Sequence, residues 1–265
     1  MSDKATHFTG TVPENYDTGL GPHFFQEFGA ELAARVAAED PESVLELAAG
    51  TGIVTRALRN ALPVDCRLVA TDLNPPMLGV AAEKFENYEE VSFEEADAMS
   101  LPFDDGAFEA IACQFGVMFF PGKAESFAEA KRVLVEGGVY HFNVWDTWEG
   151  NPFGRICQDV AEKFFPDDPP QFYKMPFSYP DPDVIEADLK ASGFSDISIE
   201  TVNLEQEIDF PLLARGLIYG NPMFEEIQDR GGDPDEVMAA IEAVLRAEFG
   251  DPGVMPIRAL FVRAA

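Results

Sequence analysis

The chain has 265 residues, enough to bury one large core, and its composition of 46% hydrophobic and 25% charged residues is that of an ordinary globular protein. Its charge is unusual, because 48 acidic residues against 18 basic ones leave a formal net charge of -30. Binding to a phosphate backbone needs clustered Lys and Arg, so DNA, RNA and anionic membrane surfaces are not expected partners.

The cysteines and the start of the chain bear on metals, disulfides and location. Cys66, Cys113 and Cys157 are far apart and form no CxxC pair, which argues against a disulfide framework and against a metal site. The opening MSDKATHFTG has no apolar signal-peptide core, and no apolar run nears the ~18 residues that a membrane span needs. We therefore expect a cytoplasmic protein, and its oligomeric state stays open.

From Pro41 onward, short apolar runs alternate with helical patterns, which is typical of βαβ units around a parallel sheet. Before this alternation, residues 1–40 are predicted to form a helical cap whose second half, 24–38, has the pattern of an amphipathic helix. The predicted strands are residues 43–47, 67–72, 91–95, 107–113 and 139–145, and the predicted helices between them are residues 51–61, 75–85 and 124–134.

Residues 146–265 are predicted to complete the same single domain as a lid or substrate half with the closing strands. Residues 146–181 are crowded with Pro and aromatic side chains, which suits either a lid with substrate-binding walls or a surface loop that packs its own small core. Asp181 and Pro182 begin one later helix, Asp233 and Pro234 begin another, and the chain ends on a strand at residues 255–262.

Glycines and carboxylates follow the first three predicted strands, at the edge where parallel α/β sheets bind ligands. The first strand continues into VLELAAGTG, where Gly50 and Gly52 allow a tight turn and a close approach to a ligand. Asp72 ends the second strand, placed to accept hydrogen bonds from ribose hydroxyls. Asp97 and Ala98 follow the third strand, where a carboxylate suits the amine of adenine. Together these strand ends suit an adenosine moiety.

Two cofactors contain adenosine, and charge separates them. Dinucleotide-binding turns have the pattern GxGxxG or GxGxxA, but Thr55 stands at the third position here, and Glu46 would repel a pyrophosphate. S-adenosylmethionine has no phosphate, and its ammonium and sulfonium groups are positive. The acids therefore favour S-adenosylmethionine, and an NAD-binding oxidoreductase is the weaker alternative.

Four segments carry a resemblance to a known family: VLELAAGTG, VATDLNPPML, EEADAMSLPFDDGAFEAIACQFGVMFF and VLVEGG. In this order they resemble the class I S-adenosylmethionine-dependent methyltransferases, in the small-molecule branch that includes the ubiquinone and menaquinone biosynthesis methyltransferases. The resemblance covers residues 43–145, the expected cofactor-binding half. It implies a Rossmann-like α/β fold with a seven-stranded, mostly parallel sheet, helices on both faces and an antiparallel last strand.

The resemblance also implies roles for individual residues. Gly50 and Gly52 with Ala48 would line the methionyl end, and Glu46 would hold the ammonium group. The other implied contacts are ribose with Asp72, adenine with Leu73, Met77, Asp97 and Ala98, and the sulfonium with Gln114 and Phe115.

The acceptor is less well defined than the cofactor. CQFG replaces the Asn/Asp-Pro-Pro-Tyr motif of methyltransferases that act on adenine or glutamine amines, which favours in-line methyl transfer to a small or medium organic molecule. We name no catalytic base. A non-catalytic protein that binds the cofactor for regulation or scaffolding is the alternative from another class. Candidate acceptor-binding residues are Tyr16, His23, Asn143, Trp145 and Trp148.

The charge leads to a testable prediction. Self-repulsion among the acids weakens the compact state at low ionic strength, and screening relieves it. The melting temperature should therefore rise between about 0.01 M and 1 M salt, over which the screening length shrinks from ~30 to ~3 Å. Thermal unfolding across this series tests the prediction, and a flat or falling curve would contradict it.

Overall fold

A sheet in the order β3-β2-β1-β4-β5-β7-β6 forms the centre of the computed structural model, which describes residues 8, 10–86 and 89–265. Its central strands are apolar and buried, as strands with helices on both faces must be. The strands are β1 (Ser43–Glu46), β2 (Arg67–Asp72), β3 (Val91–Glu95), β4 (Phe108–Gln114), β5 (Leu134–Trp145), β6 (Ile197–Ile208) and β7 (Gly253–Ala264).

The pairing confirms the predicted fold class. β1 lies between β2 and β4 and is parallel to both, so that Leu45 is paired with Val69 on one side and Ile111 on the other. β2 is parallel to β3, and β4 to β5. β7 is antiparallel to both of its neighbours, β5 and β6. The parallel strands therefore bring the ends of β1, β2 and β4 to one edge of the sheet.

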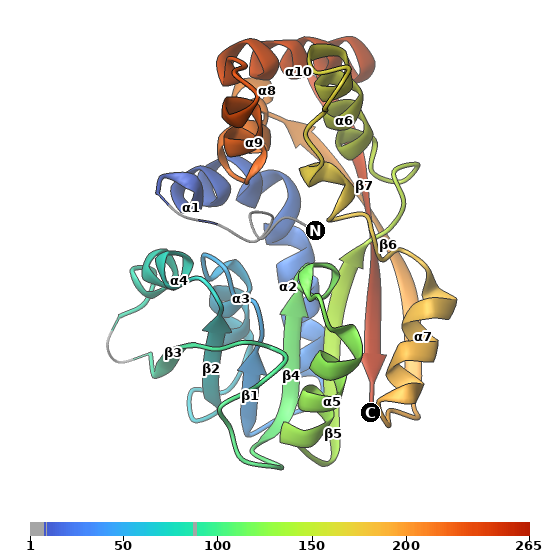
Figure 1. The fold of residues 1–265 in the computed structure, drawn as a ribbon. Helices are drawn as coiled ribbons and strands as arrows, with labels where there is room; N and C mark the ends of the chain where they lie inside the picture. The colour runs from blue at the N-terminus through green and yellow to red at the C-terminus, as the bar shows by residue number, and fades with distance from the viewer. Residues whose placement is uncertain (1–7, 9, 87–88) are drawn as a thin grey trace.

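Helices cover both faces, also as predicted (Figure 1). α2 (Gln26–Ala37) packs with α3 (Ile53–Ala61) on one face, and α5 (Lys123–Val133) packs with α7 (Pro182–Ala191) on the other. α4 (Pro75–Ala82) contacts β2 and β3. The predicted start of α7 is confirmed, because the Asp181 side chain accepts hydrogen bonds from the backbone N–H groups of Asp183 and Val184.

A helical lobe lies beyond the carboxyl ends of the strands (Figure 1, top). It contains α6 (Pro152–Phe164), α8 (Phe210–Tyr219), α9 (Met223–Asp229) and α10 (Pro234–Phe249). α6 lies inside the stretch 146–181, for which sequence reasoning foresaw a lid or a loop. Its signal is Pro152 at the first helical position after Asn151. The abundance of aromatic residues obscured this signal.

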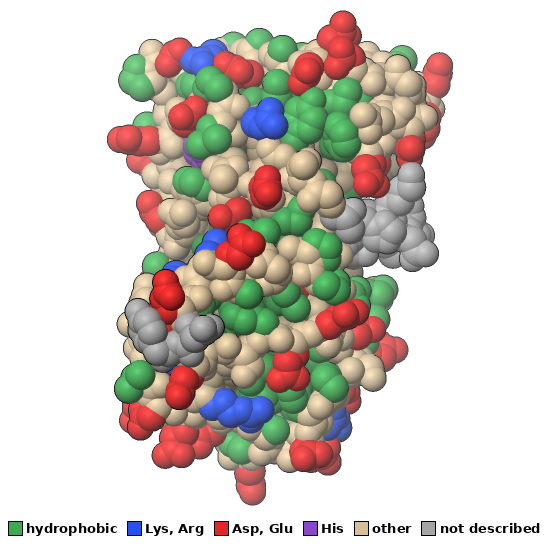
Figure 2. All heavy atoms as spheres, turned by 90° about the vertical axis from the view of Figure 1, so that its left-hand side faces the viewer, with side chains coloured by type: hydrophobic (Ala, Val, Ile, Leu, Met, Phe, Trp, Pro, Cys, Tyr) green, Lys and Arg blue, Asp and Glu red, His purple; other side chains and the backbone are tan. Residues whose placement is uncertain are grey.

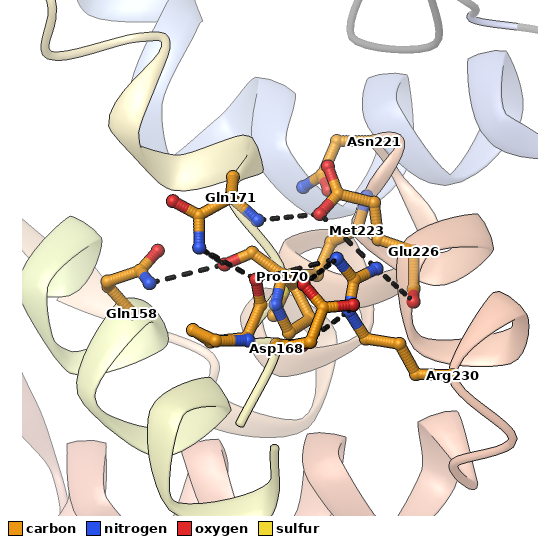
Figure 3. Close-up of polar contacts among 9 residues, drawn as sticks. Gln158, Asp168, Pro170, Gln171, Asn221, Met223, Glu226 and Arg230 are labelled. Atoms are coloured by element: carbon orange, nitrogen blue, oxygen red, sulfur yellow. Dashed lines mark hydrogen bonds and ion pairs between the residues drawn. The ribbon is translucent and has the colours of Figure 1, made fainter. Parts of the chain in front are cut away.

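Polar contacts fix the rest of this stretch to the lobe (Figure 3). Arg230 Nε donates to the Asp168 carbonyl at 2.6 Å, and Gln158 Nε2 donates to the Pro170 carbonyl at 3.2 Å. The backbone N–H of Gln171 donates to Glu226 Oε2 at 2.6 Å. These bonds join the loop after α6 to α9, and two short 3₁₀ helices, η3 (Val117–Phe119) and η4 (Phe172–Lys174), complete the elements near it.

The amino-terminal cap lies between the sheet and the helical lobe (Figure 1). It contains α1 (Val12–Asn15) and the wide helix η2 (Tyr16–Phe25), which runs directly into α2; residues 1–7 and 9 of the predicted cap lie outside the described residues. η2 crosses α8 at two glycines, and a Cβ placed on Gly19 would lie 2.7 Å from Gly216 Cα. Only glycines permit this approach, so the cap packs directly on the lobe.

Acidic side chains are spread over both the sheet region and the helical lobe (Figure 2). None of the helices in the described part of the chain has both the length and the apolar composition that crossing a membrane requires.

Candidate active site

A tight turn follows β1 and brings the backbone close to two neighbouring elements. Ala48, Gly50 and Gly52 all have positive φ angles, of 52°, 56° and 79°. A Cβ placed on Gly52 would lie 2.8 Å from the Cβ of Ala81 in α4, and one on Gly116 would lie 2.6 Å from the Cβ of Ala48. The predicted tight turn at Gly50 and Gly52 is confirmed by their positive φ angles, and Gly52 is needed in addition for close packing against α4, which was not predicted.

Asp72, at the end of β2, fixes this turn. Its Oδ2 accepts a hydrogen bond from the Gly50 N–H at 2.9 Å, and its Oδ1 accepts from the Asn74 N–H at 2.8 Å. Burial raises the pKa of the Asp72 carboxyl, and the backbone donors of Asn74 and Gly50 oppose the shift. Oδ1 also accepts from Asn74 Nδ2 at 3.2 Å, so the acceptor capacity left for a ligand hydroxyl lies on Oδ2, which accepts only the Gly50 N–H among the described residues.

Glu46, at the end of β1, is almost wholly enclosed, with 1% of its surface exposed. Its Oε2 is buried and has no hydrogen-bond partner. Burial raises the pKa of Glu46 to about 8; the hydroxyl and N–H of Thr55 oppose the shift, and the nearby charge of Asp72 adds to it. Buried carboxylates normally have partners, so this oxygen indicates a site for a cationic or hydrogen-bond-donating ligand.

An apolar surface and a further carboxylate lie beyond Asp72. Leu73 is 53% exposed, which is unusual for a leucine directly after a buried strand, whereas Met77 is buried. Asp97 Oδ1 accepts from the Met99 N–H at 2.9 Å, so its second oxygen is not used by that turn, and Ala98 beside it is partly buried. An exposed apolar side chain beside two carboxylates suits a flat ring that carries an amine.

Gln114 and Phe115 follow β4 and are tied to the cap. Gln114 Nε2 donates to the Phe25 carbonyl at 3.1 Å, and Asn143 Nδ2 donates to Gln114 Oε1 at 3.3 Å. The Phe115 N–H donates to Asn143 Oδ1 at 3.0 Å, and Phe115 itself has a positive φ of 49°. Asn143 is also fully buried. Both ends of its amide are hydrogen-bonded, to Gln114 and to Phe115, so it positions these two residues instead of facing an acceptor.

The predicted aromatic wall is mostly packed upon itself. Trp145 is 4% exposed and stacks on Phe115, with ring centroids 4.1 Å apart and planes 10° apart. Phe153 and Phe177 contact Trp145 in turn, and Phe177 contacts Trp148 edge to face at 6.1 Å. Phe153 also stacks on Phe24 of the cap at 4.2 Å, so these rings are part of the main core and do not form a separate core of a surface loop. Trp148 is at the margin of these rings, partly exposed, with a buried indole nitrogen that has no partner.

The two candidate residues in the cap have different surroundings. Tyr16 stacks on Phe25 at 4.8 Å, and burial followed by the charges of Asp72 and Asp17 raises the pKa of its hydroxyl. His23 Nδ1 contacts the Gly19 carbonyl at 2.8 Å, and its Nε2 accepts from the Asp209 N–H at 3.2 Å. Neither nitrogen of His23 is left for an acceptor, so this residue holds η2 against α8.

Sequence reasoning missed one residue of this region. Asp17, next to Tyr16, accepts a hydrogen bond from Thr51 Oγ1 at 2.7 Å and forms an ion pair with Lys84. The signal available was its place in the segment GTVPENYDTGLGPHFF, where only Tyr16 and His23 were singled out. A pairing across 34 residues has no local pattern that would indicate it.

A glycine turn after β1, carboxylates at the end of β2 and after β3, and a carboxylate oxygen without a partner at the end of β1 are the arrangement expected of a class I S-adenosylmethionine-dependent methyltransferase. The chain matches the family model described as a methyltransferase domain over residues 44–138. It is 33% identical over 185 residues to a demethylmenaquinone methyltransferase from Thermus thermophilus, a match that covers 63% of this chain and 84% of that protein.

A second relative agrees with the first. A ubiquinone/menaquinone biosynthesis C-methyltransferase from Rhizobium etli is 30% identical over 188 residues, covering 62% of this chain and 71% of the relative. The chain therefore belongs to the family of S-adenosylmethionine-dependent methyltransferases that contains these two proteins. Its cofactor is S-adenosylmethionine, and the comparisons support neither the NAD-binding alternative nor the non-catalytic one.

Solved structures confirm the fold over nearly the whole chain. The phosphoethanolamine N-methyltransferase 2 of Haemonchus contortus, solved with phosphomonomethylethanolamine and S-adenosylhomocysteine, has a TM-score of 0.63 at 17% identity and covers 98% of this chain and 58% of that one. The [4+2]-cyclase SpnF has a TM-score of 0.56 at 17% identity, covering 91% and 81%. Because one fold hosts both reactions, these likenesses establish the fold alone.

Glu46 provides a pH test of the site. Below its ordinary pKa of 4.5 the carboxyl is protonated in both folded and unfolded chains; between about 4.5 and 8 the unfolded chain ionises while the folded one keeps its proton. The stability that this group contributes to the cofactor-free protein is thus lost as the pH rises through that window. The melting temperature of Glu46→Gln minus that of the wild type should increase from pH 5 to pH 8.

The matched control is Glu94→Gln, at an exposed position of β3, which should follow the wild-type pH profile. A constant difference between Glu46→Gln and the wild type over the same range would show that the carboxyl is ionised in the folded protein throughout.

Proposed function

We propose that this chain transfers the methyl group of S-adenosylmethionine to a neutral, small or medium-sized organic molecule with an apolar body. The observation that carries the cofactor half of the proposal is the buried Glu46 oxygen without a partner, directly beneath the glycine turn. An ammonium group is the ligand that such an oxygen lacks, and its positive charge would return the pKa of Glu46 toward the ordinary range.

The chain's own residues would bind and orient the cofactor. Glu46 would hold the methionyl ammonium, with the turn formed by Ala48, Gly50 and Gly52 around it. Asp72 would accept from the ribose hydroxyls while it retains the Gly50 N–H. When bound, S-adenosylmethionine supplies an electrophilic methyl group on a positively charged sulfur. The remaining proposed contacts are Leu73, Met77, Asp97 and Ala98 at adenine and Gln114 and Phe115 near the sulfur.

Charge argues that the acceptor is neutral. Glu46, Asp72 and Asp97 surround the proposed cofactor position, and the nearby Lys84 is already paired with Asp17. Lys123, after the β4 loop, is also engaged, because its ammonium group contacts the carbonyls of Met118 and Phe120. A phosphate or carboxylate on the acceptor would therefore meet these acids, while Lys84 and Lys123 are both already engaged. The same reasoning, with the acidic surface, excludes nucleic acid from the proposal.

The body of the acceptor is proposed to be a ring. Phe115 and Tyr16 place aromatic rings at the end of β4 and in the cap, and Trp145 packs against Phe115. The two relatives are named for demethylmenaquinone and for ubiquinone and menaquinone. We propose an electron-rich ring of this general kind, entering beside Trp148, whose indole N–H would bind a ring oxygen.

Catalysis would then come from alignment and exclusion of water. Aligning two reactants can contribute roughly 7–11 kcal/mol, and the cap closes the site from above. No general base is proposed: His23 is occupied by backbone groups, and His141 contacts Glu39, in the segment between α2 and β1, at 3.0 Å. An acceptor that supplies its own electron pair fits this arrangement.

A labelled-methyl assay tests the proposal. Transfer from S-adenosylmethionine should be detected with electron-rich phenols, hydroquinones or naphthohydroquinones, and not with phosphorylated amines, oligonucleotides or protein. Trp148→Ala should raise KM for the acceptor or lower kcat, while S-adenosylmethionine affinity stays within about twofold. Transfer to proteins or nucleic acid, or a Trp148 variant that loses the cofactor and keeps the acceptor, would contradict this account.

A further inference from the structure

Asp17 is contacted by two elements of the cofactor-binding half at once. Its Oδ1 accepts a hydrogen bond from Thr51 Oγ1 at 2.7 Å and forms an ion pair with the ammonium of Lys84, just beyond α4. The side chains of Asp17 and Lys84 are 23% and 27% exposed, so the pair is partly shielded from water and from screening by salt. One carboxylate thus joins the cap, the β1 turn and α4.

Thr51 makes this contact important for the cofactor. It lies between Gly50 and Gly52 and is 1% exposed. Gly50 is held by Asp72, and Gly52 packs on Ala81. The third contact that holds the turn is the hydrogen bond from Thr51 to Asp17, which belongs to the cap. If the cap moves, the turn loses this hydrogen bond.

Residues next to Asp17 in the cap contact α8 of the helical lobe. Asn15 Oδ1 accepts from Arg215 Nε at 2.9 Å, and a Cβ placed on Gly220 would lie 3.0 Å from Tyr16 Cα. Together with the close packing of Gly19 on Gly216, this hydrogen bond and this contact attach residues 15–19 to α8. Within the described part of the chain, Asp17 is the one side chain of residues 10–23 that hydrogen bonds to the cofactor-binding half.

We propose that Asp17 is a positioning residue that latches the cap and the helical lobe onto the β1 turn, so that the cofactor is exchanged only when its contacts with Thr51 and Lys84 open. The inference rests on the proposed function for its cofactor. The latch acts on entry and release of the cofactor and on the position of the turn, and it takes no part in the bond changes of methyl transfer.

The test measures release of labelled S-adenosylmethionine from the full chain after a chase with unlabelled cofactor. Asp17→Ala should release it about tenfold faster, the scale expected when a hydrogen bond to a charged group is lost. Lys84→Met, which keeps the apolar stem, should also accelerate release, and exchanging the two charges (Asp17→Lys with Lys84→Asp) should recover part of the loss. Glu14→Gln, at an exposed position of the same cap, is the control and should match the wild type.

A second measurement needs no cofactor. In the cofactor-free protein, Asp17→Ala should raise amide hydrogen exchange in residues 10–22 and 47–55 together, while residues 108–114 of β4 stay protected. Wild-type release rates in Asp17→Ala, or faster exchange confined to the cap, would overturn the latch and leave the proposed function standing. Failure of the wild type to retain any S-adenosylmethionine would instead overturn the proposed function, and the exchange result alone would then decide whether Asp17 couples the two segments.

Discussion

The burial of a carboxylate at the tip of β1 is the constraint on which the rest of the site depends. Glu46 is enclosed by the sheet, by α3 and by the glycine turn, and one of its oxygens has no partner. Leaving a charge so placed is costly, and the high pKa of about 8 is the protein's response. In the proposed function a cation beside Glu46 would make this arrangement favourable, with the turn, the Asp72 bonds and the cap around it.

The few basic residues are used to join segments of the chain to one another. Arg132 connects α5 to the loop before β4 through the Phe103 carbonyl at 2.7 Å and Asp105 at 2.9 Å. Arg59 donates to the Cys66 carbonyl at 2.9 Å, and Arg230 fixes the loop after α6 (Figure 3). Acidic side chains are far more numerous, and Figure 2 shows them spread over one face of the molecule. The surface is thus left strongly negative, which disfavours anionic molecules at the site.

Local patterns predicted the parts of the fold that depend on neighbours in sequence. The positions of β1, β2 and β3 and the caps of α7 and α10 were correctly inferred, because alternation and capping residues signal them. The antiparallel last strand was implied by the family resemblance and is confirmed. The strand β5 begins at Leu134, before the predicted 139, because Gly137 with its positive φ lies in a bulge inside the strand instead of a turn before it.

What could not be predicted depends on partners far along the chain. The amide of Asn143 is used by Gln114 and Phe115, and His23 by Asp209, so residues with suitable chemistry proved to be structural supports. Asp17 had no recognised pattern, yet it contacts Thr51 and Lys84. The assignments of Asp72, Asp97 and Leu73 remain predictions about a ligand, supported by free acceptor capacity and by an exposed apolar side chain.

Calorimetric titration with S-adenosylmethionine tests the central claim most directly. The wild type and Asp104→Ala, a control at an exposed position, should bind the cofactor with equal affinity and should not bind NADH tightly. Asp72→Ala should lose roughly 1.5–3 kcal/mol of binding free energy, the usual scale for hydrogen bonds to a charged group. Wild-type affinity in Asp72→Ala, or tight binding of NADH by the parent protein, would contradict the assignment of the site.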